Sequence, residues 1–167
     1  MSNERKKIAL VGLKGAGKDY IANTMFSEYT KISFASKLKD VTSVLFDLPR
    51  DMLEGDTPES REWREQVDER LTSLFDRPIT PRWLLQYVGT EVFREAFPGI
   101  WYKLLHIPEG RVIVTDCRFP DEMKFLKSKG FTIFHVYDGR EPNFNDHPSE
   151  WSFTLFPVDG IINNFRD

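Results

Sequence analysis

A glycine-rich segment near the amino end has the residue types that bind phosphate groups. Residues 12–19 read Gly-Leu-Lys-Gly-Ala-Gly-Lys-Asp, which has the spacing G-x-x-x-x-G-K. Glycines allow such a loop to curl so that its backbone N–H groups face a polyphosphate, and the N-terminus of a following helix adds partial positive charge. The spacing therefore predicts a P-loop that binds a nucleotide such as ATP. Its predicted phosphate-binding residues are Gly12, Lys14, Gly15, Ala16, Gly17, Lys18 and Asp19.

The residue after Lys18 departs from the usual pattern of such loops. A Ser or Thr commonly stands there and offers its hydroxyl to Mg²⁺, whereas this chain has Asp19. A carboxylate is also a hard oxygen ligand, able to hold Mg²⁺ directly or through water. Alternatively, Asp19 only favours the N-terminus of the following helix through its negative charge.

A second group of candidate residues follows the apolar run Val-Ile-Val at 112–114. Asp116 ends this predicted strand, as the acid of a Walker B motif does, and Arg118 lies two residues further on. In a parallel sheet such an acid emerges at the carboxyl edge, where ligands bind. We expect Asp116 to organise Mg²⁺ together with Asp19, and Arg118 to contact phosphate oxygens. The structural alternative is a local ion pair between Asp116 and Arg118 that fixes the turn.

A P-loop alone does not distinguish a GTPase, a motor, a small-molecule kinase or a binding module without activity. The 167 residues leave no room for a large regulatory domain, and the sequence contains no N-K-x-D guanine motif. These observations favour a small kinase.

The elements that must position these residues alternate between strands and helices. Strands are predicted over 8–11, 32–35, 111–115, 131–137 and 161–162. Helices are predicted over 18–29, from Ser36, over 61–75, from 81 to about 98, and over 120–129. Residues 48–60 contain two prolines and a glycine and are predicted to form a mobile loop. The alternation predicts an α/β fold of the P-loop NTPase type, with three layers and a mainly parallel sheet of about five strands with helices on both faces. The length predicts a single domain over residues 1–167.

Composition argues against several functional classes. A net charge of −3 does not suit a protein that mainly coats nucleic acid. The apolar runs are too short to span a membrane, and the polar amino end does not resemble a signal peptide. The single cysteine, Cys117, excludes an intramolecular disulfide and a multi-cysteine zinc site. We therefore expect a cytoplasmic protein without nucleic-acid or membrane partners, and the sequence leaves a homodimer open.

Several motifs, spread over most of the chain, resemble those of the bacteriophage deoxynucleoside monophosphate kinases. Residues 115–122 resemble the family's D-x-R-F-P-[ND]-E segment, and residues 81–91 resemble its R-x-L-L-Q-x-x-G-T-[DE] helix. Residues 34–40 are similar to its F-A-x-x-L-K element, and residues 146–150 to its D-x-H-x-S-E lid motif. The G-K-D ending of the phosphate loop is this family's variant, shared with animal-type phosphomevalonate kinases. The resemblance covers residues 8 to about 164.

The resemblance implies transfer of the ATP γ-phosphoryl group to the 5′-phosphate of a deoxynucleoside monophosphate (dNMP). The reaction would take place in the host cytoplasm if a phage encodes the protein. Lys18, Asp116 and Arg118 would be the catalytic residues, with Mg²⁺ as the metal. By motif match, the acceptor pocket would contain Lys39, Arg82, Gln86, Arg94, Trp101 and Arg118.

Structural alternatives accompany these assignments. Arg82 is alternatively a solvated helix charge, and Trp101 a core residue. Residues 138–150 would form a lid over ATP, with Arg140 as its cation, and His147 and Glu150 alternatively only hold the base of this lid. A kinase for another small phosphorylated acceptor, such as phosphomevalonate, and a nucleotide-binding module without catalysis are the alternative functions.

Overall fold

The computed structural model describes residues 5–165, which divide into two compact units. Residues up to Phe34 and from Leu105 onward form the first unit, and Ala35–Leu104 form the second. The prediction of one domain over residues 1–167 stays a prediction, because a long insertion within one domain gives the same division.

The first unit is built on a five-stranded sheet in which all neighbouring strands of the described residues run parallel. Its strands are β1 (Lys7–Val11), β2 (Thr30–Ile32), β3 (Val112–Val114), β4 (Thr132–Tyr137) and β5 (Gly160–Asn163). They lie in the order β2-β3-β1-β4-β5, so β1 is central. The predicted α/β fold with about five parallel strands is confirmed.

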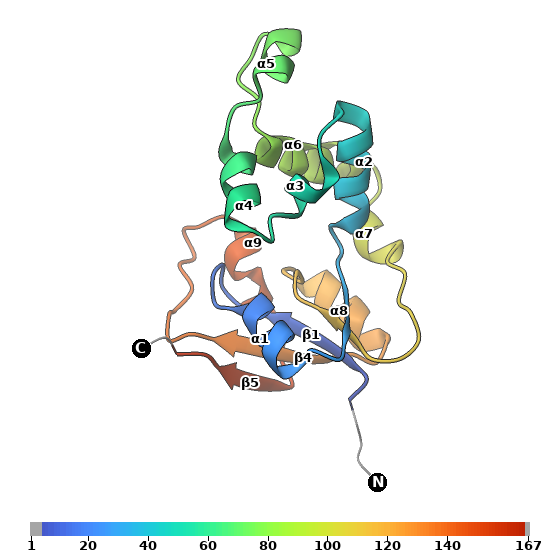
Figure 1. The fold of residues 1–167 in the computed structure, drawn as a ribbon. Helices are drawn as coiled ribbons and strands as arrows, with labels where there is room; N and C mark the ends of the chain where they lie inside the picture. The colour runs from blue at the N-terminus through green and yellow to red at the C-terminus, as the bar shows by residue number, and fades with distance from the viewer. Residues whose placement is uncertain (1–4, 166–167) are drawn as a thin grey trace. The chain divides into compact units, whose positions relative to one another are not determined.

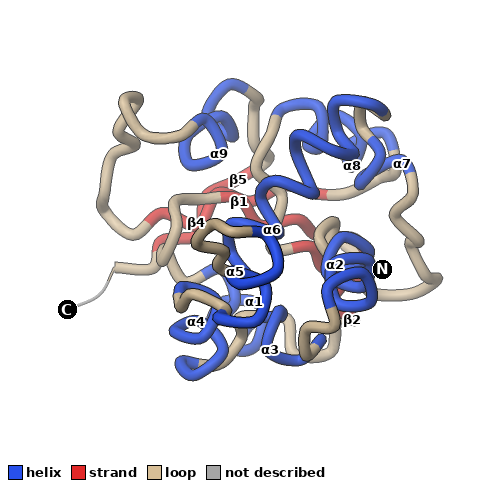
Figure 2. The backbone as a smooth tube through the Cα atoms, turned by 90° about the horizontal axis from the view of Figure 1, so that it is seen from above, coloured by secondary structure: helices blue, strands red, loops and turns tan. Residues whose placement is uncertain are grey.

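Helices cover both faces of this sheet. They are α1 (Lys18–Met25), α8 (Pro120–Ser128), α9 (Pro148–Trp151) and the 3₁₀ turn η2 (Ser152–Leu155). Helix α1 lies on one face, and α8 and α9 lie on the other (Figures 1 and 2). On the α1 face, Ile21 packs in a cluster with Ile8 and Leu10. On the opposite face, the rings of His135 and Phe153 lie 5.2 Å apart. Residues 8–11 of β1 point alternately to the two faces and are all buried, which explains why this part of the strand is continuously apolar.

The second unit is helical throughout its described elements. They are α2 (Ser36–Phe46), α3 (Arg50–Glu54), α4 (Pro58–Glu65), α5 (Glu69–Phe75), α6 (Pro81–Tyr87), the π-helix η1 (Val88–Arg94) and α7 (Ile100–Lys103). Its core is a cluster of buried aliphatic side chains that come from separate helices and the loops between them: Leu48, Leu53, Leu71, Ile79 and Leu84.

The prediction that residues 48–60 form a mobile loop was wrong. Helix α3 and the start of α4 occupy this segment, and Leu53 is fully buried in the core of the unit. Both prolines stand where proline is compatible with a helix: Pro49 directly precedes α3, and Pro58 is the first residue of α4. The side chain of Thr57 accepts a hydrogen bond from Ser60 N and so caps α4.

Two long predicted helices are each divided in the structure. The segment 61–75 belongs to α4 and α5, and Asp68 begins the second of these by accepting a hydrogen bond from Leu71 N. The segment from 81 to about 98 begins as α6 and continues as the wider turns of η1, which end at Arg94. The predicted strand 32–35 lies earlier, at Thr30–Ile32, and the predicted helix 18–29 ends at Met25.

Candidate phosphate-binding and catalytic site

Sheet topology brings two of the predicted motifs to one edge. The chain leaves β1 toward β2 on one side and leaves β3 toward β4 on the other, although β1 and β3 are neighbours. Ligands of open parallel sheets bind beside such a reversal, outside the carboxyl ends of the strands. The phosphate loop follows β1, and Asp116 follows β3, so both lie at this edge.

The glycines of the loop have backbone conformations that other residues adopt with difficulty. Gly12 has a φ of +151°, and a Cβ there would lie 2.6 Å from the backbone oxygen of Val136. Gly17 has a φ of +92° and directly precedes α1. A residue outside the loop also holds it in place, because Asn164 Nδ2 donates a hydrogen bond to Ala16 O at 2.8 Å. The loop is thus shaped by β4 and by the chain after β5, in addition to its own sequence.

Lys18 occupies the first position of α1 and turns back onto the loop. Its Nζ donates to Gly12 O at 2.8 Å and to Leu13 O at 3.0 Å. Burial, followed by the positive charge of Arg118, lowers the pKa of Lys18 to about 8. The positive charges of Lys18 and Arg118 therefore influence each other in a partly desolvated environment. An anion bound there would favour the charged form of Lys18.

Asp19 lies in the first turn of α1, and one of its carboxylate oxygens accepts hydrogen bonds. Lys31 Nζ and Thr115 Oγ1 donate to its Oδ1 at 2.6 and 3.1 Å. Burial raises the pKa of Asp19, but the hydrogen bond and charge of Lys31 outweigh it, so that the pKa is lowered overall. Within the described residues, Oδ2 of Asp19 receives no hydrogen bond.

Asp116 is held by the chain that follows β2. Ser33 Oγ donates to its Oδ2 at 2.6 Å, and Phe34 N donates to its Oδ1 at 3.2 Å. Because Thr115, the preceding residue, donates to Asp19, the two predicted metal-binding carboxylates are linked through neighbouring residues. Across residues 5–165, no three His, Cys, Asp or Glu side chains gather as a metal site. Mg²⁺ commonly uses one or two carboxylates with substrate phosphates and water, so this pair suits it.

Arg118 lies two residues before α8, where the buried side chain of Glu122 fixes the backbone. Glu122 Oε2 accepts from Arg118 N at 2.8 Å and from Phe119 N at 3.1 Å. The guanidinium of Arg118 is half-exposed and pairs with Glu150 Oε1 at 3.7 Å. Its backbone is therefore fixed, while its side chain remains accessible to a ligand.

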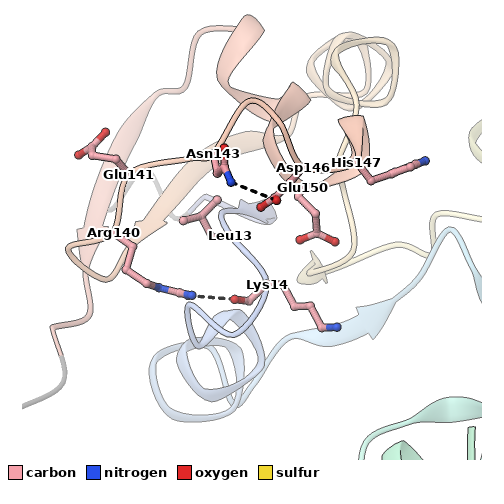
Figure 3. A pocket seen from close by; sticks show the side chains of 8 residues that line it. All are labelled: Leu13, Lys14, Arg140, Glu141, Asn143, Asp146, His147 and Glu150. Carbon is pink, nitrogen blue, oxygen red and sulfur yellow. Dashed lines mark hydrogen bonds between the residues drawn. The ribbon is translucent and has the colours of Figure 1, made fainter. Parts of the chain in front are cut away.

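The segment predicted to form a lid faces the phosphate loop across a pocket of about 490 Å³. Figure 3 shows Arg140 pointing to the loop, where its Nη2 donates to Lys14 O at 2.9 Å. Arg140 also pairs with Asp138 at 2.6 Å, which raises the pKa of the arginine. The segment is not a loop throughout, because α9 begins at Pro148 and His147 Nδ1 accepts from Ser149 N at 3.2 Å. This hydrogen bond is compatible with the alternative that His147 only holds the base of the predicted lid.

The predicted acceptor residues all belong to the second unit, except for Arg118. Arg82 and Gln86 stand one turn apart on α6, where Arg82 pairs with Glu65 and Gln86 is exposed. Lys39 Nζ pairs with Glu54 Oε1 at 2.9 Å. Arg94 is half-buried in the last turn of η1.

Trp101 connects two helical segments of the second unit. Its indole Nε1 donates to Gly89 O at 3.0 Å, and its ring lies edge-on to Phe93. The side chain is half-buried. Trp101 therefore contributes to packing without being a fully buried core residue, and part of its side chain stays accessible.

Sequence reasoning missed four residues that hold the site. Lys31 and Thr115 position Asp19, Ser33 positions Asp116, and Asn164 positions the phosphate loop. Thr115 directly precedes the candidate residue Asp116, which is a local signal, whereas Ser33 was predicted inside a strand at 32–35 and in the structure follows β2. The bond from Asn164 spans 148 residues, and no local pattern signals it.

Comparison with known proteins supports a kinase. No protein-family model matches the chain. A protein of Acanthamoeba polyphaga mimivirus named "Putative deoxynucleotide monophosphate kinase" is 30% identical over 162 residues, covering 86% of this chain and 79% of the viral protein. Among the described residues, no helix is both long and apolar enough to cross a membrane. With its parallel α/β sheet and the similarity to the viral protein, this chain belongs to the same family of nucleotide kinases.

Proposed function

We propose that this protein transfers the γ-phosphoryl group of ATP to the 5′-phosphate of a dNMP. The observation that carries the proposal is the pair of cations at the phosphate loop. Lys18 is half-buried, desolvation lowers its pKa to about 8, and the charge of Arg118 contributes to that shift. Such an arrangement leaves positive charge that a polyphosphate would neutralise.

The chemistry needs positioning and charge neutralisation more than covalent help from the protein. An oxygen of the acceptor phosphate forms a bond to the γ-phosphorus, and the bond from that phosphorus to the β–γ bridging oxygen breaks. The products are ADP and a deoxynucleoside diphosphate. Lys18 and the loop N–H groups would hold the donor phosphates, and Arg118 would stabilise the charge on the transferring group.

Asp19 and Asp116 are the residues that would hold Mg²⁺. The bound ion would neutralise phosphate charge and orient the phosphate oxygens. The accessible Oδ2 of Asp19 suits this role, and Thr115 and Ser33 keep the two carboxylates in place.

Arg140 would act on the donor side. It already reaches the phosphate loop at Lys14 O, and it borders the pocket between that loop and residues 141–150. Closure of this segment over ATP would exclude water, which would otherwise accept the phosphoryl group.

Arg118 would contribute to binding the acceptor, together with residues of the second unit: Lys39, Arg82, Gln86, Arg94 and Trp101. The name of the viral relative supports a deoxynucleotide monophosphate as acceptor. We place the reaction in the cytoplasm, with ATP and dNMP as the small-molecule partners.

A substrate panel tests the proposal. Each natural dNMP is incubated with ATP and Mg²⁺, and ADP release is followed in a coupled assay. We expect ADP release that depends on at least one dNMP and exceeds ATP hydrolysis without acceptor. ADP release with none of them, or release with phosphomevalonate alone, would contradict it.

A further inference from the structure

Arginine side chains gather on one side of the second unit, where α4 meets the end of α3 and α6. Arg61 and Arg64 belong to α4, and Arg82 belongs to α6, which packs against α4. Arg61 is exposed, and its Nη1 donates to Asp56 O at 3.2 Å. Arg82 pairs with Glu65. Arg64 differs from both in how it is held.

The guanidinium of Arg64 sits in a space that a glycine leaves open. A Cβ at Gly55 would lie 2.2 Å from Arg64 Cζ, so the guanidinium packs directly on the glycine backbone. Gly55 has a φ of +70° and ends α3. The Nε of Arg64 is fully buried and has no hydrogen-bond partner within residues 5–165. A buried N–H without a partner is costly, and arginines held only for stability rarely keep one.

The charges around Arg64 leave its own charge without a dedicated partner. Burial and then the like charge of Arg82 lower the pKa of Arg64, whereas Glu65 and Glu54 oppose this shift. Glu65 pairs with Arg82, and Glu54 pairs with Lys39 and with Arg50. Both carboxylates that act on Arg64 are therefore engaged by other cations.

We infer that Arg64 binds the phosphate group of the acceptor together with Arg82, an assignment that rests on the proposed function. Guanidinium groups match the geometry of phosphate oxygens, and two of them suit a phosphate monoester dianion. Arg64 as a whole is half-buried and its Nε is covered, so the phosphate would bind at Nη1 or Nη2 of its guanidinium. The donor phosphates have their own cations at the phosphate loop, and α6 carries the acceptor residues predicted from the sequence. Arg64 lies outside every motif on which the resemblance rests.

Equilibrium binding tests this assignment separately from turnover. The full chain is titrated calorimetrically with each natural dNMP in the absence of ATP, as wild type and as Arg64→Met, Arg64→Lys and Arg70→Met. Arg70 is an exposed arginine of the same unit, whose Nη2 donates to Phe46 O, and it serves as the matched control. We expect Arg64→Met to weaken dNMP binding by about tenfold to a hundredfold, Arg64→Lys to restore part of it, and Arg70→Met to leave it unchanged.

Thermal unfolding separates a binding role from a structural one. Arg64→Met removes a buried N–H without a partner and a repulsion from Arg82, so the melting temperature should not fall. Equal dNMP affinity of wild type and Arg64→Met would overturn the inference and leave the proposed function intact. Absence of dNMP binding by the wild type would also overturn it, and the proposed function would still be judged by turnover in the substrate panel.

Discussion

Lys18 changes its charge in a pH range that is easily reached in experiments. Its pKa is lowered to about 8, first by burial and then by Arg118. Below this pH most of the protein carries the charged ammonium, and above it the neutral amine dominates. The triphosphate of ATP is already ionised there, because a terminal phosphate group loses its last proton at a pKa of about 6.

The ATP affinity of the wild type should therefore fall as the pH rises through about 8. Binding draws a proton onto Lys18, so the loss approaches about tenfold per pH unit only well above that value. Calorimetric titration with ATP over this range measures it. Lys18→Met should bind weakly at every pH and lose the inflection. An unchanged pH dependence in that variant would assign the titration to another group.

Asp116 has hydrogen bonds that give it a structural role besides its predicted catalytic one. Asp116→Asn removes the carboxylate charge, so the hydrogen bonds that Ser33 Oγ and Phe34 N make with this side chain lose their charge-assisted strength. We expect a loss of about 1 kcal/mol in the free energy of unfolding. We also expect a fall in turnover of about a hundredfold or more, because the carboxylate charge is gone.

Ser33→Ala separates the two roles of Asp116. It removes one hydrogen bond and leaves the carboxylate in place, so it should lower stability by a similar amount and keep most of the turnover. Urea unfolding and the ADP-release assay report both quantities. Equal losses of turnover in Asp116→Asn and Ser33→Ala would favour a purely structural Asp116.

At the scale of elements, the phosphate loop depends on the strand beside it. A Cβ at Gly12 would meet the backbone oxygen of Val136 in β4 at 2.6 Å, and a backbone atom inside a sheet cannot easily give way. Gly130, after α8, has a φ of +83° but nothing within 4 Å of an added Cβ. The two glycines therefore differ in steric room while sharing a positive φ.

Gly12→Ala should lower the free energy of unfolding by about 3 kcal/mol, and Gly130→Ala by about 1 kcal/mol. Only the first should also weaken ATP binding, because it displaces the phosphate loop. Urea denaturation and ATP titration of both variants provide the comparison. Equal effects on stability would show that β4 does not constrain the loop.

The parts of the fold that follow local chemistry were predictable from the sequence. The buried strand β1, the loop after it and the helix between Pro120 and Gly130 each have a continuous local signal. The break between α4 and α5 and the helix at Arg50–Glu54 were not predictable in this way. They depend on the capping residues Thr57 and Asp68 and on burial of Leu53 against distant helices. Tertiary packing there outweighs the loop-forming tendency of proline and glycine.

The same distinction applies to the candidate site. Lys18, Asp19 and Asp116 were identified because their motifs fix their spacing. Arg64 was not, since its signal is an unpaired buried Nε that only the packing of α3 and α4 creates. Asn164 reaches the phosphate loop from the end of the sheet, a contact that depends on strand order.

At the scale of the whole molecule, the proposed binding of phosphates would rely on individually positioned cationic groups and not on overall charge. The chain has a net charge of −3, so it does not attract anions as a whole. Each unit nevertheless contains two cationic side chains, one of which lowers the pKa of the other. Arg118 lowers the pKa of Lys18 in the first unit, and Arg82 lowers the pKa of Arg64 in the second. A phosphoryl-transfer enzyme needs two such places, one for the donor and one for the acceptor.

Transfer of a labelled γ-phosphate tests this account most directly. ATP carrying radioactive phosphorus in its γ-position is incubated with the wild-type chain, Mg²⁺ and each natural dNMP, and the products are separated by chromatography. We predict that label appears in the deoxynucleoside diphosphate, and that Lys18→Met reduces it by orders of magnitude. Label that appears only in inorganic phosphate, or that stays in ATP with every dNMP, would contradict the account.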